Sequence, residues 1–170
     1  DQWKNKGLLP KDVKLGKVSS ILKSILKVYQ IYQEKIKDLN AFDFGDLILF
    51  CVKLFEEHRD IRQIYHNNFK YILVDEFQDT NFIQNKWLNL LVNSKKNICC
   101  VGDDDQSIYS WRGAEIKNFL TFDKIYENCK VFKLEQNYRS TKNILETASH
   151  LISNNSNRVG KKLWSSSNQG

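Results

Sequence analysis

Apolar residues along the chain follow two different spacings. Short continuous apolar runs at 71–74 and 97–101, and another near 130–134, are typical of buried strands. The segments before and between them carry apolar residues at helical spacing. This spacing predicts helices over residues 17–37, 43–58, 61–67, 115–126 and 141–154, and one after Thr80 with Ile83, Trp87, Leu88 and Leu91 on one face.

The order of these elements predicts the fold class. Strands that alternate with helices at such distances form a parallel sheet covered by helices, so we expect an α/β fold. Asp43 suits the N-cap of its helix, and Asp46 lies in the first turn, where a carboxylate interacts favourably with the helix dipole.

The amino-acid composition indicates a folded protein. Hydrophobic residues make up 41% of the 170 residues and aromatic residues 12%, which supports a folded core and argues against disorder. The net charge of +6 mildly favours a polyanionic partner.

No signal peptide or apolar run of membrane-spanning length occurs, so we expect no membrane partner and a cytoplasmic location. The chain contains no methionine, and we expect it to be cut from a longer protein.

The cysteines do not indicate a metal site or a disulfide framework. They form no CxxC pair and have no nearby set of histidines. Cys99 and Cys100 are adjacent in a predicted strand and would point to opposite faces. We interpret all four as reduced core residues: Cys51, Cys99, Cys100 and Cys129.

The first chemistry-bearing stretch reads YILVDEFQDT, residues 71–80. Its apolar run ends at Asp75 and Glu76, and open α/β sheets bind ligands at the carboxyl ends of their strands. In a nucleotide hydrolase the first such carboxylate holds Mg²⁺ and the second polarises the attacking water. The alternative is that the pair forms a solvated turn or a helix N-cap.

The second stretch, GDDDQSIYSWRGA at residues 102–114, follows the second strand. Its acids would repel phosphate, so some must be capped or turned away. Gln106 can donate and accept hydrogen bonds, as a sensor of a γ-phosphate requires. Tyr109, Trp111 and Arg112 can stack bases and contact phosphates without reading sequence. Alternatively, Trp111 is a core residue and Tyr109 a surface phenol.

The third stretch, LEQNYRST at residues 134–141, places Arg139 at a strand-to-helix junction. An arginine there can be an ordinary structural ion-pair partner. It can also reach across a cleft and neutralise charge on a transferring phosphoryl group.

Taken together, DEFQDT, GDDDQSIYSWRGA and LEQNYRST resemble the UvrD/Rep/PcrA family of superfamily 1 DNA helicases, most closely its UvrD-type branch. The resemblance extends over the whole chain. It implies an ATP-dependent enzyme that tracks 3′ to 5′ along single-stranded DNA and unwinds duplex DNA, commonly in repair.

The resemblance also assigns roles to individual residues. It implies that Asp75 holds Mg²⁺ and that Glu76 is the catalytic base. Gln106 would couple the γ-phosphate to the DNA site, and Arg139 would be the arginine finger, so that all four would contact ATP. The DNA-binding residues would be Tyr109, Trp111 and Arg112.

A partial RecA-like domain of the P-loop NTPase fold is implied as well. Residues 1–40 would end an inserted helical subdomain, 41–130 would be the second half of the first RecA-like domain, and 131–170 would begin the second. No G-x-x-x-x-G-K-[ST] sequence occurs, so the phosphate-loop strand is missing. We therefore expect the chain alone to be inactive and its exposed sheet edges to permit self-association.

Two other interpretations remain open. A helicase–nuclease subunit shares DEFQDT, although no nuclease carboxylate cluster is visible. A non-catalytic DNA-binding module that has lost its phosphate loop is the other. Intact Asp75, Glu76 and Gln106, together with Arg139, argue against that module, because a protein without ATPase activity has no chemical need for them.

Overall fold

The computed structural model describes residues 1–16, 20–156 and 158–167. The main helices are α2 (Ser20–Asp38), α3 (Phe44–Glu57), α4 (Arg59–Asn68), α5 (Phe82–Leu91) and α8 (Lys142–Ile152), with the short helices α1 (Gln2–Asn5), α6 (Ile116–Leu120) and α7 (Phe122–Ile125). Helices occur in every segment where the sequence predicts one, although the helix predicted over 115–126 is divided into α6 and α7. The predicted start at Lys17 lies outside the described residues. No helix among the described residues is long and apolar enough to cross a membrane.

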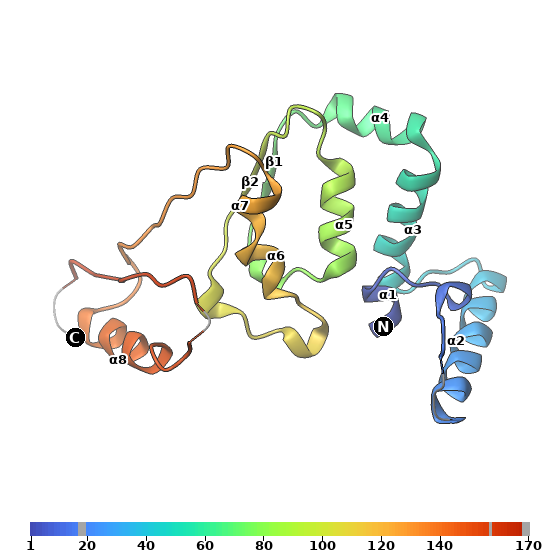
Figure 1. Ribbon diagram of the computed structural model, residues 1–170, viewed down its shortest axis with the longest axis horizontal. Helices are drawn as coiled ribbons and strands as arrows, with labels where there is room; N and C mark the ends of the chain where they lie inside the picture. Colours follow the sequence, from blue (N-terminus) through green and yellow to red (C-terminus); the bar gives the residue numbers. More distant parts are fainter. Residues whose placement is uncertain (17–19, 157, 168–170) are drawn as a thin grey trace.

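The sheet consists of β1 (Ile72–Val74) and β2 (Ile98–Cys100), which pair in parallel with Val74 opposite Cys100. Backbone bonds extend the pairing at the carboxyl end, where Val101 N donates to Val74 O at 2.8 Å and Phe77 N to Val101 O at 3.0 Å. The predicted α/β class is confirmed: helices flank a small parallel sheet, as in a partial RecA-like domain (Figure 1).

The buried core lies between helices rather than on the sheet. Leu49 and Val52 of α3 pack against Ile83 of α5, and all three are almost completely buried. Half-buried apolar side chains surround them: Leu9, Ile48, Trp87 and Leu90. Because α5 leads from β1 to β2, this helix pair fixes the sheet to the rest of the chain (Figure 1).

A buried ion-pair cluster holds the amino-terminal helices together. Lys4 Nζ lies 2.6 Å from Asp43 Oδ2 and 2.8 Å from Asp46 Oδ1, and Lys4 and Asp46 are both buried. Asp43 also caps α3 as predicted, accepting from Asp46 N at 2.9 Å. Burial alone would raise the pKa of Asp43, but hydrogen bonds from Lys4, the Asp46 backbone and Tyr32 lower it below its usual value.

Helix α2 is attached by polar groups more than by its apolar face. Tyr32 Oη donates to Asp43 Oδ2 at 2.9 Å, Gln33 Nε2 to Asp46 Oδ1 at 3.0 Å, and Tyr29 Oη to Leu8 O at 3.0 Å. None of the described residues of α2 is buried. The helix stands at the edge of the molecule, on the side away from the sheet (Figure 1).

Two boundaries predicted from the sequence were wrong. The helix predicted over 115–126 is broken into α6 and α7 at Thr121, whose hydroxyl donates to Lys117 O at 2.8 Å. Asn81 rather than Thr80 caps α5, because its side chain accepts from Gln84 N at 3.0 Å.

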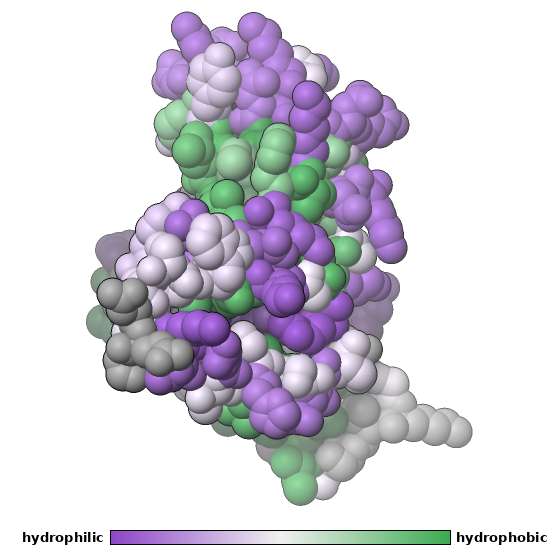
Figure 2. Space-filling model, turned by 90° about the vertical axis from the view of Figure 1, so that its left-hand side faces the viewer, coloured by the Kyte–Doolittle hydropathy of each residue, from purple (hydrophilic) through white to green (hydrophobic). Residues whose placement is uncertain are grey.

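The strand predicted near 130–134 does not form. A strand needs a neighbouring strand to exchange hydrogen bonds, and among the described residues none pairs with this segment. The segment runs from α7 towards α8 instead (Figure 1). Its apolar side chains stay exposed, with Phe132 79% and Leu134 83% accessible. Seen from the side of α8, the molecule carries a hydrophobic band between hydrophilic regions (Figure 2).

The interpretation of the cysteines as core residues is only partly correct. All four are free thiols. Cys100 and Cys129 are half-buried, but Cys51 and Cys99 are exposed. Cys99 and Cys100 do point to opposite faces of β2, and the face that carries Cys99 and its partner Leu73 is open.

The buried cluster yields the first prediction. Lys4→Met leaves the fully buried carboxylate of Asp46 without its cation, so we expect the free energy of unfolding to fall by about 3–5 kcal/mol. Lys53→Met is the matched control, because Lys53 forms a longer, partly exposed pair with Asp12 at 3.7 Å. The control should change stability by about 0–1 kcal/mol. Equal losses in urea denaturation of the two variants would refute a special role for the cluster.

Candidate functional site

The chain turns sharply where β1 ends. Asp75 and Glu76 follow Val74 directly, and both side chains are exposed. Glu76 has a left-handed backbone with φ 50°, and its N–H donates to Asp75 Oδ1 at 2.9 Å. A non-glycine residue in this conformation is strained, and such residues cluster at functional sites. The turn presents two carboxylates at the carboxyl edge of the sheet.

Gln78 connects this turn to the loop after β2. The side chain is 1% exposed, its Nε2 donates to Glu76 Oε2 at 2.6 Å, and its Oε1 accepts from Asp103 N at 3.0 Å. Gly102 makes room for it: a Cβ at that position would lie 2.6 Å from Gln78 Oε1 and 2.9 Å from the Phe119 ring. One amide therefore fixes the distance between the Glu76 carboxylate and the second strand's loop.

Sequence reasoning gave Gln78 no role, although the residue lies inside the quoted DEFQDT stretch. The available signal was a polar residue next to Phe77 directly after a predicted buried strand. A polar side chain that is buried there needs hydrogen-bond partners. A single sequence does not show which loop supplies those partners.

The acids of the second stretch are neutralised by the carboxy-terminal segment. Arg158 donates to both oxygens of Asp105, at 2.8 and 2.5 Å, and Lys161 Nζ contacts Asp103 Oδ1. Asp104 Oδ2 accepts from the backbone N–H of Val159 at 2.7 Å. The expectation that these acids are capped is confirmed, and the sequence gave no indication of the capping residues.

These contacts shift the titration of the loop. Burial alone would raise the pKa of Asp103, but hydrogen bonds from Lys161, Gln106 and the Asp105 backbone lower it. The hydrogen bond to Asp105 raises the pKa of Arg158 above its usual value. Asp103 therefore stays ionised and paired with Lys161 at neutral pH, and the contacts of Asp105 with Arg158 compensate further negative charge of the loop.

Gln106 ends the short helix η3 (Asp104–Gln106) with an exposed side chain. Its Nε2 donates to Asp103 Oδ2 at 2.7 Å. Asp103 in turn donates its backbone N–H to Gln78, so Glu76 and Gln106 are joined through two intermediate residues. The role of Gln106 as a phosphate sensor stays a prediction.

Two aromatic rings and a guanidinium gather at η4 (Ser110–Arg112). The centroids of Tyr109 and Trp111 are 6.4 Å apart, and Arg112 Cζ lies 5.0 and 4.7 Å from them. Trp111 is 71% exposed, so the alternative that it is a core residue is wrong. Asn5 Nδ2 donates to Arg112 O at 3.1 Å, which anchors the loop to the end of α1.

The structure does not bring Arg139 to the carboxylates. Its side chain is exposed, and its backbone N–H donates to Asn137 Oδ1 at 2.9 Å. Within the described residues no ion pair engages the guanidinium, so the structural ion-pair alternative has no support there. Arg139 also has no hydrogen bond to Asp75, Glu76 or Gln106 in that part of the chain.

The carboxylates suit magnesium better than a metal held by protein alone. No group of three or more His, Cys, Asp or Glu residues in the described part of the chain could hold a metal ion. Mg²⁺ is usually bound by one or two carboxylates together with substrate phosphates and water. Asp75, exposed at the end of β1 beside Glu76, fits that pattern.

Comparison with known proteins gives the family. The UvrD/REP helicase N-terminal domain model matches residues 1–127, and the UvrD-like helicase C-terminal domain model matches residues 132–170. A probable DNA helicase II homolog of Rickettsia conorii is 48% identical over 170 residues, covering 99% of this chain and 26% of the relative.

Two relatives named ATP-dependent DNA helicase PcrA show the same pattern. The protein of Leuconostoc citreum is 44% identical across 98% of this chain and 22% of its own length, and that of Bacillus subtilis 49% identical across 84% and 19%. The chain thus spans about a quarter or less of these relatives. The two family models cover nearly all of the sequence, and the chain belongs to the UvrD/Rep helicase family.

Proposed function

We propose that this chain is part of an ATP-dependent DNA helicase that couples Mg-ATP hydrolysis to 3′–5′ tracking on single-stranded DNA and to duplex unwinding, in DNA repair. One observation carries the proposal. The buried side chain of Gln78 ties Glu76 to the loop that holds Gln106 and, a few residues on, Tyr109 and Trp111. Because its proposed partner is DNA, we also propose that the protein acts in the cytoplasm.

Each carboxylate has a separate task in this proposal. Asp75 would hold Mg²⁺, and the ion would supply positive charge to neutralise the phosphates. Glu76 accepts a proton from the attacking water, and the bond from Gln78 Nε2 holds one of its oxygens in position. The exposure of both side chains leaves room for nucleotide and water.

Gln106 links the phosphate chemistry to DNA. Its amide is held by Asp103, which is the residue that also contacts Gln78. A γ-phosphate that draws the Gln106 amide away from Asp103 would shift the start of the loop that leads to Trp111. The nucleotide state then changes the position of the base-stacking rings.

Arg139 acts from the other domain. We assign residues 1–40 to the end of a helical subdomain, 41–130 to the first RecA-like domain and 131–170 to the second. The guanidinium of Arg139 is exposed and has no ion pair with any described residue, so it is available to reach the phosphates when bound ATP draws the two RecA-like domains together.

The two alternatives have less support. The relatives carry helicase names, which favours a helicase over a helicase–nuclease subunit. A non-catalytic module would need no hydrogen bond between a buried glutamine and Glu76, and the structure has that bond. The phosphate-binding loop must come from outside this sequence, so the activity belongs to the complete protein.

Removal of the base tests the chemistry. In the complete protein, Glu76→Gln should lower DNA-stimulated ATP turnover by about 100-fold or more, because an amide cannot accept the proton. Nucleotide binding should persist, since shape and the Gln78 contact are largely kept. Glu127→Gln, an exposed glutamate after α7, is the matched control and should have normal turnover. Normal turnover in Glu76→Gln, measured by phosphate release, would disprove the assignment.

Removal of the exposed ring tests the DNA contact. In the complete protein, Trp111→Ala should weaken single-strand binding by about 1–3 kcal/mol with little sequence preference. Its melting temperature should barely change, because the ring is 71% exposed. Phe132→Ala removes another exposed ring, 79% accessible, far from this loop in the sequence, and should leave the affinity unchanged. A large loss of stability with unchanged affinity per folded molecule would exclude stacking.

A further inference from the structure

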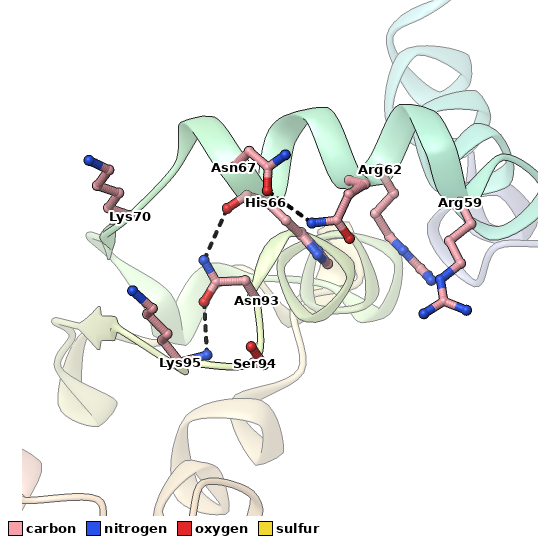
Figure 3. Close-up of a pocket in the computed structure, with 9 residues that line it drawn as sticks. Arg59, Arg62, His66, Asn67, Lys70, Asn93, Ser94 and Lys95 are labelled. Carbon is pink, nitrogen blue, oxygen red and sulfur yellow. Dashed lines mark hydrogen bonds between the residues drawn. The ribbon is translucent and has the colours of Figure 1, made fainter.

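A basic groove runs between α4 and the loop that connects α5 to β2, with a volume of about 540 Å³ (Figure 3). The helix supplies one wall and residues 93–95 the other. Five of the lining side chains are basic or imidazole: Arg59, Arg62, His66, Lys70 and Lys95. The remainder are uncharged polar groups: Gln63, Asn67, Asn93 and Ser94.

The helix wall follows from sequence spacing. Arg59, Arg62 and His66 are separated by three and four residues, which places them on one face of α4. At about 1.5 Å per residue, this face presents its cationic and imidazole groups along roughly 10 Å. Lys70 lies two residues beyond the end of the helix, at the other end of the groove from Arg59 (Figure 3).

Hydrogen bonds hold the two walls together. Asn93 Nδ2 donates to the carbonyl oxygens of His66 and Phe69, each at 3.2 Å, and its Oδ1 accepts from Lys95 N at 3.0 Å. His66 Nε2 donates to Leu90 O at 2.8 Å. The shape of the groove is therefore fixed before any ligand arrives.

The positive charge of the groove is not compensated. No carboxylate lines it, and across residues 1–16, 20–156 and 158–167 no ion pair engages Arg59, Arg62, Lys70 or Lys95. Cations elsewhere in the same ranges do find acids, as Lys86 does with Glu56 at 2.6 Å. A concave surface with unpaired charge of one sign attracts a ligand of the opposite sign.

We propose that this basic groove binds the sugar–phosphate backbone of duplex DNA. The arginines and lysines suit phosphate oxygens, and the amides and Ser94 suit phosphate and sugar oxygens. Among the described residues no Phe, Tyr or Trp lines the groove, and the His66 ring is held by its hydrogen bond to Leu90 O. The groove therefore offers no aromatic platform on which the bases of a single strand could stack. A duplex carries twice the phosphate density of one strand along its axis, which matches a site that works by charge alone.

The groove is separate from the candidate site for nucleotide and single strand. It lies where α4 and the 93–95 loop enter β1 and β2, at the amino ends of the strands. Asp75 and the loop with Gln106 follow the carboxyl ends of the same strands. The proposal rests on the proposed function for its choice of DNA as the partner.

The test uses the complete protein with Arg59→Gln/Arg62→Gln, which removes two charges and keeps polar helix-forming side chains. Fluorescence anisotropy measures the affinity for a blunt duplex and for a single strand of equal length, over a series of salt concentrations. We expect duplex affinity to fall about tenfold at low salt, and the slope of log K against log salt to fall by about two. Single-strand affinity should change less than about twofold.

Two further variants make the result specific. Lys124→Gln/Lys130→Gln removes the same charge from exposed positions outside the groove and should leave both affinities unchanged. Arg59→Lys/Arg62→Lys keeps the charge and should retain most of the duplex affinity, which separates loss of charge from misfolding.

Several outcomes would overturn the proposal. Unchanged duplex affinity in Arg59→Gln/Arg62→Gln would do so, and so would equal losses for duplex and single strand or equal losses in the lysine control. Labelled poly-glutamate is measured in the same assay, and if Arg59→Gln/Arg62→Gln lost poly-glutamate binding but kept duplex binding, the groove would bind an acidic protein instead. If wild type binds DNA and hydrolyses ATP but the groove variant behaves like the control, only this inference fails. If wild type binds no DNA, the proposed function fails as well.

Discussion

The parallel register of β1 and β2 is the constraint on which the candidate site depends. Because Val74 lies opposite Cys100, the two chains leave the sheet side by side, one at Asp75 and the other at Gly102. Parallel strands bring their carboxyl ends to the same edge of the sheet. The parallel pairing alone therefore places Asp75 near Gly102, although they lie almost thirty positions apart in sequence. A one-residue shift of register would reverse the faces and separate Gln78 from Asp103 N.

Charge compensation is the second requirement of this edge. Three consecutive aspartates beside the proposed phosphate site would repel a phosphate ligand, and the structure pairs them with Arg158, Lys161 and the Val159 backbone. These partners come from beyond α8, in the region matched by the carboxy-terminal family model. The loop that carries Gln106 is therefore sensitive to the position of a segment distant in sequence. Any movement of that segment changes the electrostatics at the carboxyl edge.

Local patterns in the sequence were sufficient to locate the helices and the two strands, though not the break at Thr121, and to place Asp75 and Glu76 at the end of the first strand. Predictions from local patterns failed where contacts between residues distant in sequence determine the structure. The apolar run at 130–134 resembles a strand by composition, but it has no partner strand among the described residues and its side chains stay exposed. Gln78 and Arg158 carry no local signal of function, because their roles come from Asp103 and Asp105 across the fold. The spacing of residues in the sequence likewise does not show whether Trp111 is exposed or buried.

The position of the core explains why polar contacts matter so much at this site. Leu49, Val52 and Ile83 bury their side chains between α3 and α5, whereas Leu73 on the sheet is 80% exposed. The two-stranded sheet therefore gains little from hydrophobic burial on its open face. Its carboxyl edge is instead held by backbone bonds and by the buried amide of Gln78. Both outer edges of the sheet stay unpaired among the described residues. Because unpaired strand edges can pair with another chain, self-association stays a prediction for this chain.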